Sequence, residues 1–288
     1  MRRLAPIALA CALAGMVPVA QNQLPTFSSR VEAVRVDVLV TDGGRPVPDL
    51  RAADFEVFDN GVRQTVDFAS AEQLPLNVVF TFDLSGSIVG ERLDNLREAS
   101  HAVLDGLKED DQAALVTFNS AVSVGPGLTR DVRLVKAAID RAEPAGNTSL
   151  VDASFAGLML AEADVGRGLV IVFSDGIDTS SWLQPKAVLD AARRTDAVVY
   201  AVSAGQARRA EFLGDLTEQT GGRLFRIEST RSLSEVFLEV LNEFRQRYLL
   251  SYSPAGVSPG GWHTLTVRVK DRSATVRARP GYLADGPM

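Results

Sequence analysis

A carboxylate and two hydroxyls alternate with other residues in the segment 83–87, which reads Asp-Leu-Ser-Gly-Ser. The apolar run 76–82 stands directly before it and predicts a buried strand. Ligands bind at the carboxyl ends of strands in open α/β sheets, so Asp83, Ser85 and Ser87 fall where a site is expected. Oxygen donors of this kind suit a hard cation such as Mg²⁺. The segment therefore predicts a metal-dependent binding module.

Two later segments offer further oxygen donors at the same edge of the predicted sheet. The loop 146–149, Gly-Asn-Thr-Ser, comes just before a predicted helix and contributes the hydroxyl of Thr148. The strand predicted over 168–173 runs into Ser-Asp-Gly and contributes the carboxylate of Asp175. Because the carboxyl ends of parallel strands share one edge of a sheet, we expect both groups to lie near Asp83.

With these three segments the sequence resembles the von Willebrand factor A (integrin I-like) domain. The metal-ion-dependent adhesion site of that family uses Asp-x-Ser-x-Ser, a threonine on a second loop and an aspartate on a third. The resemblance covers about residues 75–246, and the layout with flanking β segments also resembles von Willebrand factor A-related secreted proteins of bacteria. It implies an open metal position for Mg²⁺ (or Mn²⁺ or Ca²⁺), which a partner protein fills with an Asp or Glu carboxylate. The metal ligands that it implies are Asp83, Ser85, Ser87, Thr148 and Asp175.

The sequence leaves other interpretations of these segments open. The hydroxyls could merely cap a helix that begins near residue 88, with the aspartate ending a strand. Asp178 could contact a metal ligand without binding the metal itself, or it could be a solvated loop carboxylate. Asp152 could complement a helix dipole or orient the Thr148 loop. Trp182, on a polar loop near the predicted site, could contact a partner or pack under the loop.

The strongest enzyme alternative is a phosphotransferase of the haloacid-dehalogenase type, since the segment 82–84, Phe-Asp-Leu, echoes its strand that ends in aspartate. Such an enzyme needs a second carboxylate two residues on as general acid or base, and Ser85 cannot exchange a proton near neutral pH. A dinucleotide-binding enzyme would need a G-x-G-x-x-G turn, which the sequence lacks. His101 and His263 are isolated, which disfavours a Ser-His-Asp triad and a zinc site. We therefore expect a protein that is not an enzyme, with a scaffold whose metal is purely structural as the remaining alternative.

Strands and helices must alternate between residues 75 and 246 for the three loops to meet. Apolar residues at helical spacing over 92–107 and 150–163, for example, alternate with strand-like apolar runs at 113–118 and 197–202. This order predicts an α/β fold, a doubly wound and mostly parallel sheet with helices on both faces, Rossmann-like in class.

Both flanks of this region are β-rich. Residues 31–41 alternate apolar and polar side chains, and Asn60-Gly61 stands between two alternating runs as in a β-hairpin. Strand-like patterns occur again after residue 247. Because each flank alone has too few strands to be stable, we predict that the α/β domain is inserted into a small β-sandwich-like domain. The predicted boundaries are 1–20 for a signal peptide, 21–74 for an N-terminal β segment, 75–246 for the von Willebrand factor A domain and 247–284 for a C-terminal β segment.

The N-terminus has the pattern of a secretory signal, with Arg2-Arg3, the apolar stretch 4–17 and small residues up to Ala20. This predicts a secreted, periplasmic or cell-surface protein without a membrane span in its mature chain; an uncleaved anchor is the alternative. Cys11, the only cysteine, lies in this stretch, so the mature chain would have no thiol unless Cys11 is a lipid-attachment site. The net charge of −6 and the lack of a basic stripe argue against a nucleic-acid partner.

Overall fold

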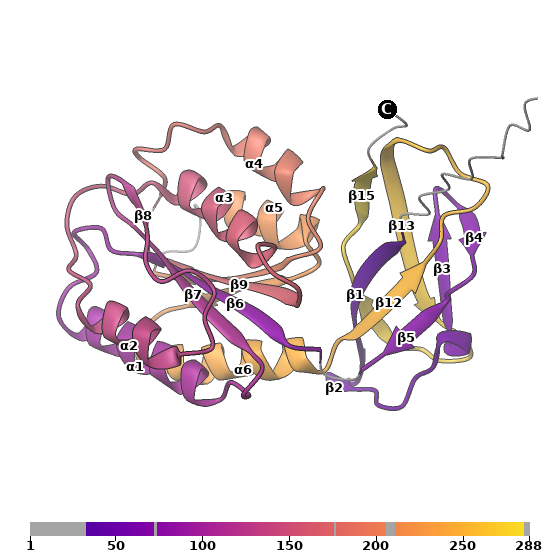
Figure 1. The fold of residues 1–288 in the computed structure, drawn as a ribbon, viewed down its shortest axis with the longest axis horizontal. Coiled ribbons are helices and arrows are strands. Elements are labelled where there is room, and N and C mark those ends of the chain that lie inside the picture. Colours follow the sequence, from indigo (N-terminus) through magenta and orange to yellow (C-terminus); the bar gives the residue numbers. More distant parts are fainter. Residues whose placement is uncertain (1–32, 72–73, 176, 206–210, 285–288) are drawn as a thin grey trace, which may run out of the picture. The chain divides into compact units, whose positions relative to one another are not determined.

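The computed structural model describes residues 33–71, 74–175, 177–205 and 211–284 of the chain (Figure 1). The predicted signal peptide 1–20, with Cys11, lies outside these residues. Within the described ranges, no helix is both long enough and apolar enough to cross a membrane.

Six strands form the sheet of the α/β region, in the order β11-β10-β9-β6-β7-β8. They are β6 (Leu76–Asp83), β7 (Gln112–Phe118), β8 (Val122–Val124), β9 (Arg167–Ser174), β10 (Val198–Ala204) and β11 (Arg223–Ile227). All neighbours pair in parallel except β7 and β8, which are antiparallel. Every residue of β6 is buried, because a parallel sheet is covered on both faces. The prediction of a mostly parallel α/β sheet is confirmed.

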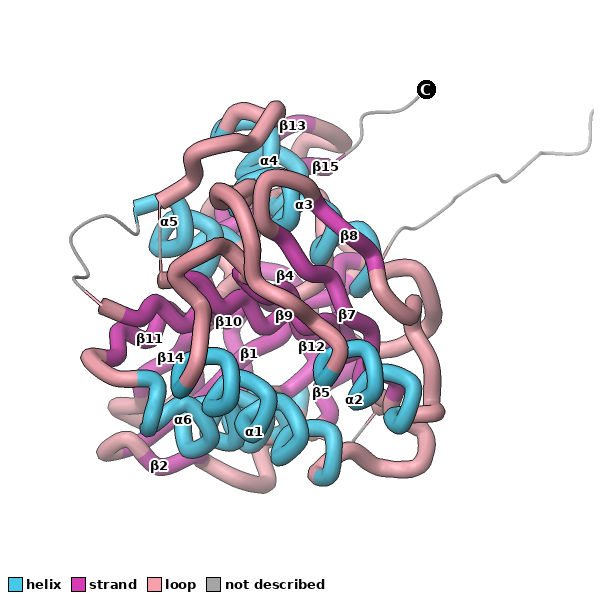
Figure 2. The backbone as a smooth tube through the Cα atoms, turned by 90° about the vertical axis from the view of Figure 1, so that its left-hand side faces the viewer, coloured by secondary structure: helices cyan, strands magenta, loops and turns pink. Residues whose placement is uncertain are grey.

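Helices cover both faces of this sheet, and Figure 2 shows the two groups on opposite sides of the strands. One face carries α1 (Glu91–Asp105), α2 (Val132–Asp140) and α6 (Leu233–Arg245), and the other carries α3 (Leu150–Ala161), α4 (Pro185–Ala192) and α5 (Glu211–Gln219). Successive residues of β6 point to opposite faces, so Phe80 packs with the first group and Val79 with the second. The loops that follow β6 and β9 consequently leave the sheet at one common edge.

The flanking segments form two antiparallel sheets, one ordered β14-β1-β12-β5 with β2 paired to β1, the other ordered β15-β13-β3-β4. Their strands are β1 (Val34–Asp42), β2 (Arg45–Pro46), β3 (Phe55–Asp59), β4 (Val62–Gln64), β5 (Phe68–Ser70), β12 (Tyr248–Tyr252), β13 (Gly261–Val269), β14 (Thr275–Arg277) and β15 (Gly281–Ala284). Short 3₁₀ turns lie at Ala52–Asp54 and Thr230–Ser232. Each sheet pairs strands from before and after the α/β region, as β1 with β12 and β3 with β13. The insertion of one domain into the other, with its boundaries, stays a prediction.

The hairpin between β3 and β4 follows the expected turn chemistry. Asn60 and Gly61 have φ values of 47° and 79°, which a two-residue turn with the hairpin twist requires. The strands β2, β5 and β15 were not expected, because runs of two to four residues carry too little alternation to be recognised.

Candidate metal centre

Asp83 is the last residue of β6, and its carboxylate is fully buried. The backbone N–H of Ser85 donates to Oδ1 at 2.8 Å, and the hydroxyl of Ser174 donates to Oδ2 at 2.6 Å. Burial raises the pKa of this carboxyl, while the hydrogen bonds from Ser174 and Ser85 act in the opposite direction. The hydrogen bonds thus orient the carboxylate of Asp83 but only partly offset the cost of burying its charge. A bound cation would stabilise that charge.

The other hydroxyls of the first loop connect Asp83 to Asp175. The Oγ atoms of Ser85 and Ser87 lie 3.2 Å apart, and the Ser87 hydroxyl donates to Oδ1 of Asp175 at 2.8 Å. The charge of Asp175 is one of the causes that raise the pKa of Asp83, so the two carboxylates interact. The structure therefore brings four of the expected residues into one hydrogen-bonded group.

Thr148 is buried, and the loop that carries it contacts the loop of Ser85 and Ser87 through the backbone. The N–H of Ala145 donates to the carbonyl of Leu84 at 2.8 Å, and the N–H of Gly86 donates to the carbonyl of Gly146 at 3.1 Å. Gly146 has φ of 71°, which favours glycine, and a Cβ there would also displace the hydroxyl of Ser120, whose Oγ would lie 2.5 Å away. The Thr148 loop is thereby fixed against the loop of Ser85 and Ser87.

Arg92, which the sequence analysis did not single out, borders the site from the first turn of α1. Its Nη1 donates to Oδ2 of Asp175 at 2.5 Å and to the carbonyl of Ser87 at 3.4 Å. The side chain of Asp175 is 6% exposed and that of Arg92 is 51% exposed. A cation in the first turn of a helix opposes the helix dipole, and this unusual position is the signal that sequence reasoning could have used.

The helix-cap interpretation of the hydroxyls is wrong. Helix α1 begins at Glu91, after Gly90, and the N-cap residue makes no side-chain hydrogen bond. Ser85 and Ser87 stand several residues before this start, with their hydroxyls in the carboxylate group. Their positions are consistent with a ligand site instead of a helix cap.

The structure discriminates between the alternatives that the sequence left open for Asp178, Asp152 and Trp182. Asp178 is not simply solvated, because its Oδ1 accepts hydrogen bonds from the N–H of Val151 and from the hydroxyl of Ser181. The carboxylate of Asp152 holds this loop and not the Thr148 loop, since it accepts from the N–H groups of residues 182 and 183 at 2.9 and 2.8 Å. Trp182 does not pack under the loop; it is 92% exposed.

The donor set fits a hard divalent cation. Two carboxylates and several hydroxyls supply only oxygen, which Mg²⁺ and Ca²⁺ prefer, and the set offers no nitrogen or sulfur. Across the described ranges, no three His, Cys, Asp or Glu residues gather in one place, so a metal at this edge would depend on the hydroxyls as well.

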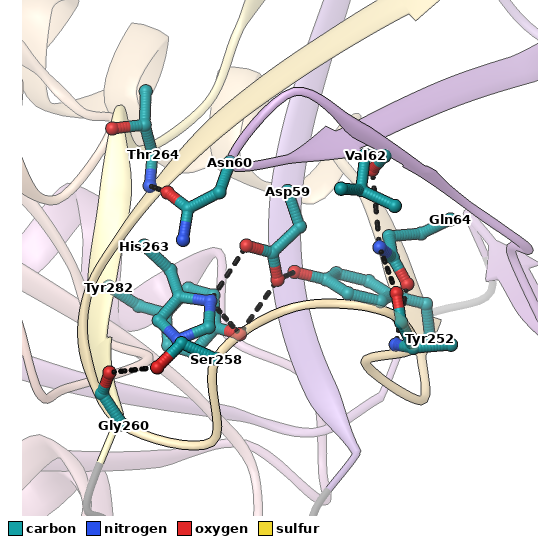
Figure 3. Close-up of polar contacts among 11 residues, drawn as sticks. Asp59, Asn60, Val62, Gln64, Tyr252, Ser258, Gly260, His263, Thr264 and Tyr282 are labelled. Atoms are coloured by element: carbon teal, nitrogen blue, oxygen red, sulfur yellow. Dashed lines mark hydrogen bonds and ion pairs between the residues drawn. The ribbon is translucent and has the colours of Figure 1, made fainter.

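A second cluster of titratable groups lies in the β sheets, around Asp59 (Figure 3). Oδ2 of Asp59 accepts from the hydroxyls of Tyr252 and Tyr282, each at 2.9 Å, and Oδ1 lies 2.7 Å from Nδ1 of His263. Asp59 and His263 are buried as a pair, and within the described ranges no third His, Cys, Asp or Glu joins them as a zinc site would require. The cluster joins β12 of one sheet to β3, β13 and β15 of the other, which indicates a structural role.

Comparison with known proteins agrees with this geometry. The family model described as von Willebrand factor type A domain matches residues 77–239. Inter-alpha-trypsin inhibitor heavy chain H4 of Bos taurus is 24% identical over 230 residues, which cover 73% of this chain and 25% of that protein. Heavy chain H2 of Mus musculus is 26% identical over 142 residues, or 45% of this chain and 15% of that protein. The chain thus spans a quarter or less of the length of these curated relatives.

Solved structures show the same fold. The von Willebrand factor type A protein from Catenulispora acidiphila superposes with a TM-score of 0.55 at 14% identity, over 83% of this chain and 75% of that one. Proximal thread matrix protein 1 from the mussel byssus, with a zinc-occupied MIDAS motif, gives 0.54 at 20% identity, over 63% and 48%. Since the family model covers more than half of the chain and agrees with the observed sheet, the chain belongs to the von Willebrand factor type A domain family.

Proposed function

We propose that this chain is a non-enzymatic, metal-dependent protein-binding module of the adhesion type. Asp83, Ser85, Ser87, Thr148 and Asp175 would hold Mg²⁺, with Mn²⁺ and Ca²⁺ as possible substitutes. The observation that carries the proposal is the hydrogen-bonded group in which Ser85 and Ser87 of one loop meet Asp175 of another beside Asp83.

A divalent cation held by these residues would favour binding to an acidic partner. Asp83 and Asp175 contribute two negative charges, and the three hydroxyl residues contribute none. A bound divalent cation would supply an open, electrophilic coordination position, which an Asp or Glu carboxylate of a partner protein fills well. In this role Ser174 and the N–H of Ser85 orient the carboxylate of Asp83, and Ser87 positions Asp175.

A location outside the cytoplasm is part of the proposal. The predicted signal sequence at 1–20 supports it, as do the names of similar proteins. One of these is the von Willebrand factor domain of the type V pili tip protein Mfa5 of Porphyromonas gingivalis, with a TM-score of 0.51 at 12% identity. The division of the chain into an α/β domain between two β segments belongs to the same proposal.

Isothermal titration of the full chain with Mg²⁺ and Mn²⁺ tests the metal site, with the Asp83→Ala variant beside the wild type. We expect one saturable site in the wild type and a loss of affinity of more than about 100-fold in the variant, since a charged ligand is removed. Asp164→Ala is the matched control, because Asp164 is an exposed carboxylate before the amino end of β9 and should leave the affinity unchanged. Equal metal affinity in the wild type and Asp83→Ala would show that the site is elsewhere.

A further inference from the structure

Trp182 is far more exposed than a tryptophan side chain ordinarily is. Trp182 is 92% exposed, and Ile177 and Leu183 on the same loop are 43% and 37% exposed. The second tryptophan, Trp262, is 39% exposed and lies 5.0 Å from the guanidinium of Arg193. Leaving the indole of Trp182 in water forgoes the hydrophobic stabilisation that Trp262 gains, so the exposure of Trp182 calls for an explanation.

The loop that carries Trp182 is built to hold the indole outward. The carboxylate of Asp152 accepts hydrogen bonds from the backbone of Trp182 and Leu183, and that of Asp178 accepts from the N–H of Val151. These contacts tie the loop to the first turn of α3, so the backbone at Trp182 is already ordered before any partner binds. An ordered aromatic side chain loses little further entropy on binding, which favours affinity.

The same loop is also tied to the proposed metal site. The carbonyl of Thr148 accepts from the N–H groups of Thr179 and Ser180 at 2.8 and 3.1 Å, and the N–H of Thr148 donates to Oγ1 of Thr179 at 3.0 Å. Asp152, whose carboxylate accepts from the N–H of Trp182, lies in the first turn of α3, directly after the Thr148 loop. One partner could therefore reach the metal position and the indole together.

The charges at this edge favour a protein partner over a membrane. Asp152 and Asp178 lie beside Trp182, and the chain has a net charge of −6, so an anionic lipid surface would repel this face. A divalent cation and the half-exposed guanidinium of Arg92 instead attract a carboxylate. The partner surface that complements this edge thus carries an acidic side chain beside apolar side chains.

We propose that Trp182 is the second anchor of the partner surface, resting on the proposed metal-dependent function. The partner is a protein segment whose Asp or Glu reaches the metal position and whose neighbouring apolar side chains cover the indole. Tryptophan residues in such positions commonly dominate binding energy, and the proposal therefore names a contact that determines which acidic segments bind.

A random cyclic-peptide library displayed on phage, panned on the full chain in Mg²⁺ and eluted with a chelator, tests this proposal. We expect the selected peptides to combine an acidic residue with apolar residues nearby. Their affinity should fall about 30-fold on Trp182→Ala, and less on Trp182→Phe. Val165→Ala is the matched control, because Val165 is 91% exposed just before the amino end of β9 and should leave affinity unchanged.

The outcomes separate this inference from the proposed function. Peptides that lose binding on Asp83→Ala but bind Trp182→Ala as tightly as the wild type would overturn the role of Trp182 alone. A library that yields no chelator-eluted binders, or binders indifferent to Asp83→Ala, would overturn the proposed function and this inference with it. Trp182-dependent binding to vesicles of phosphatidylcholine and phosphatidylglycerol, or Trp182-dependent self-association in sedimentation, would assign the indole to lipid or to a second copy and also overturn it.

Discussion

Two buried aspartates of this chain, Asp59 and Asp83, end strands in different sheets and have opposite surroundings. Neither is exposed to solvent. Asp59 is enclosed by two phenols and an imidazole, which come from β12, β13 and β15. Asp83 is bordered by small hydroxyls and a backbone N–H, most of them on loops at the carboxyl edge of a parallel sheet.

The contrast shows that the neighbours of a buried carboxylate, more than its burial, decide what it can do. The phenols that donate to Asp59 are rigid and bulky, and burial is the main cause that raises the pKa of both Tyr252 and Tyr282 well above the ordinary value. They remain neutral donors and leave the carboxylate saturated. Hydroxyls such as those around Asp83 can donate to a carboxylate or turn a lone pair to a cation, so that cluster can exchange partners.

Of the substitutions that distinguish the two regions, Asp59→Ala should have the largest effect, a loss of stability. The substitution leaves two phenols and an imidazole nitrogen without their buried acceptor, and breaking such a network costs about 3–5 kcal/mol. We expect urea unfolding to show this loss of stability, while titration with Mg²⁺ below the unfolding transition gives the wild-type affinity. A weakened metal site in Asp59→Ala with an intact fold would mean that the two regions are coupled.

Arg92→Gln should raise the affinity for Mg²⁺, whereas removal of a metal ligand lowers it. The guanidinium contacts Asp175 and reduces the negative charge that attracts a cation. A univalent and a divalent charge about 5 Å apart repel by roughly 1.7 kcal/mol in a water-like dielectric, so the affinity for Mg²⁺ should rise about tenfold.

The control for this prediction removes the same charge nearby without touching a ligand. Arg231 pairs with Glu91 at 2.7 Å, and both side chains are largely exposed, so Arg231→Gln should leave the metal affinity nearly unchanged. Weaker metal binding in Arg92→Gln would mean that the guanidinium holds Asp175 in place for the metal and does not compete with it.

The parts of the site that follow buried strands could be predicted from the sequence. The segments of Asp83 and Asp175 each come directly after an apolar run, and parallel strands bring such ends to one edge. The turn at Asn60 and Gly61 was equally predictable, because few residue pairs adopt positive φ in succession.

Contacts that depend on side-chain direction or on distant pairing could not be predicted in this way. Arg92 reaches Asp175 through its rotamer, and residues 88–90 delay the start of α1 without a capping side chain. Asp59 and His263 are 204 residues apart, and no local pattern connects them. The outward position of Trp182 depends on hydrogen bonds that its loop donates to Asp152, for which the sequence suggested a helix-dipole role or contact with the Thr148 loop.

The smallest effect concerns the stability of the metal-free protein, measured by urea unfolding in chelator for the wild type and Asp83→Asn. The amide removes a buried charge but weakens two hydrogen bonds, so the two proteins should differ by less than about 1 kcal/mol at neutral pH. Because burial raises the pKa of Asp83 in the folded state above its ordinary value, the native state keeps the proton after the unfolded state has lost it. Unfolding then releases a proton, and the stability of the wild type falls relative to Asp83→Asn as pH rises through that window. Added Mg²⁺ should stabilise the wild type alone at neutral pH, whereas a wild type that gains stability over the variant on raising the pH in chelator would contradict the raised pKa.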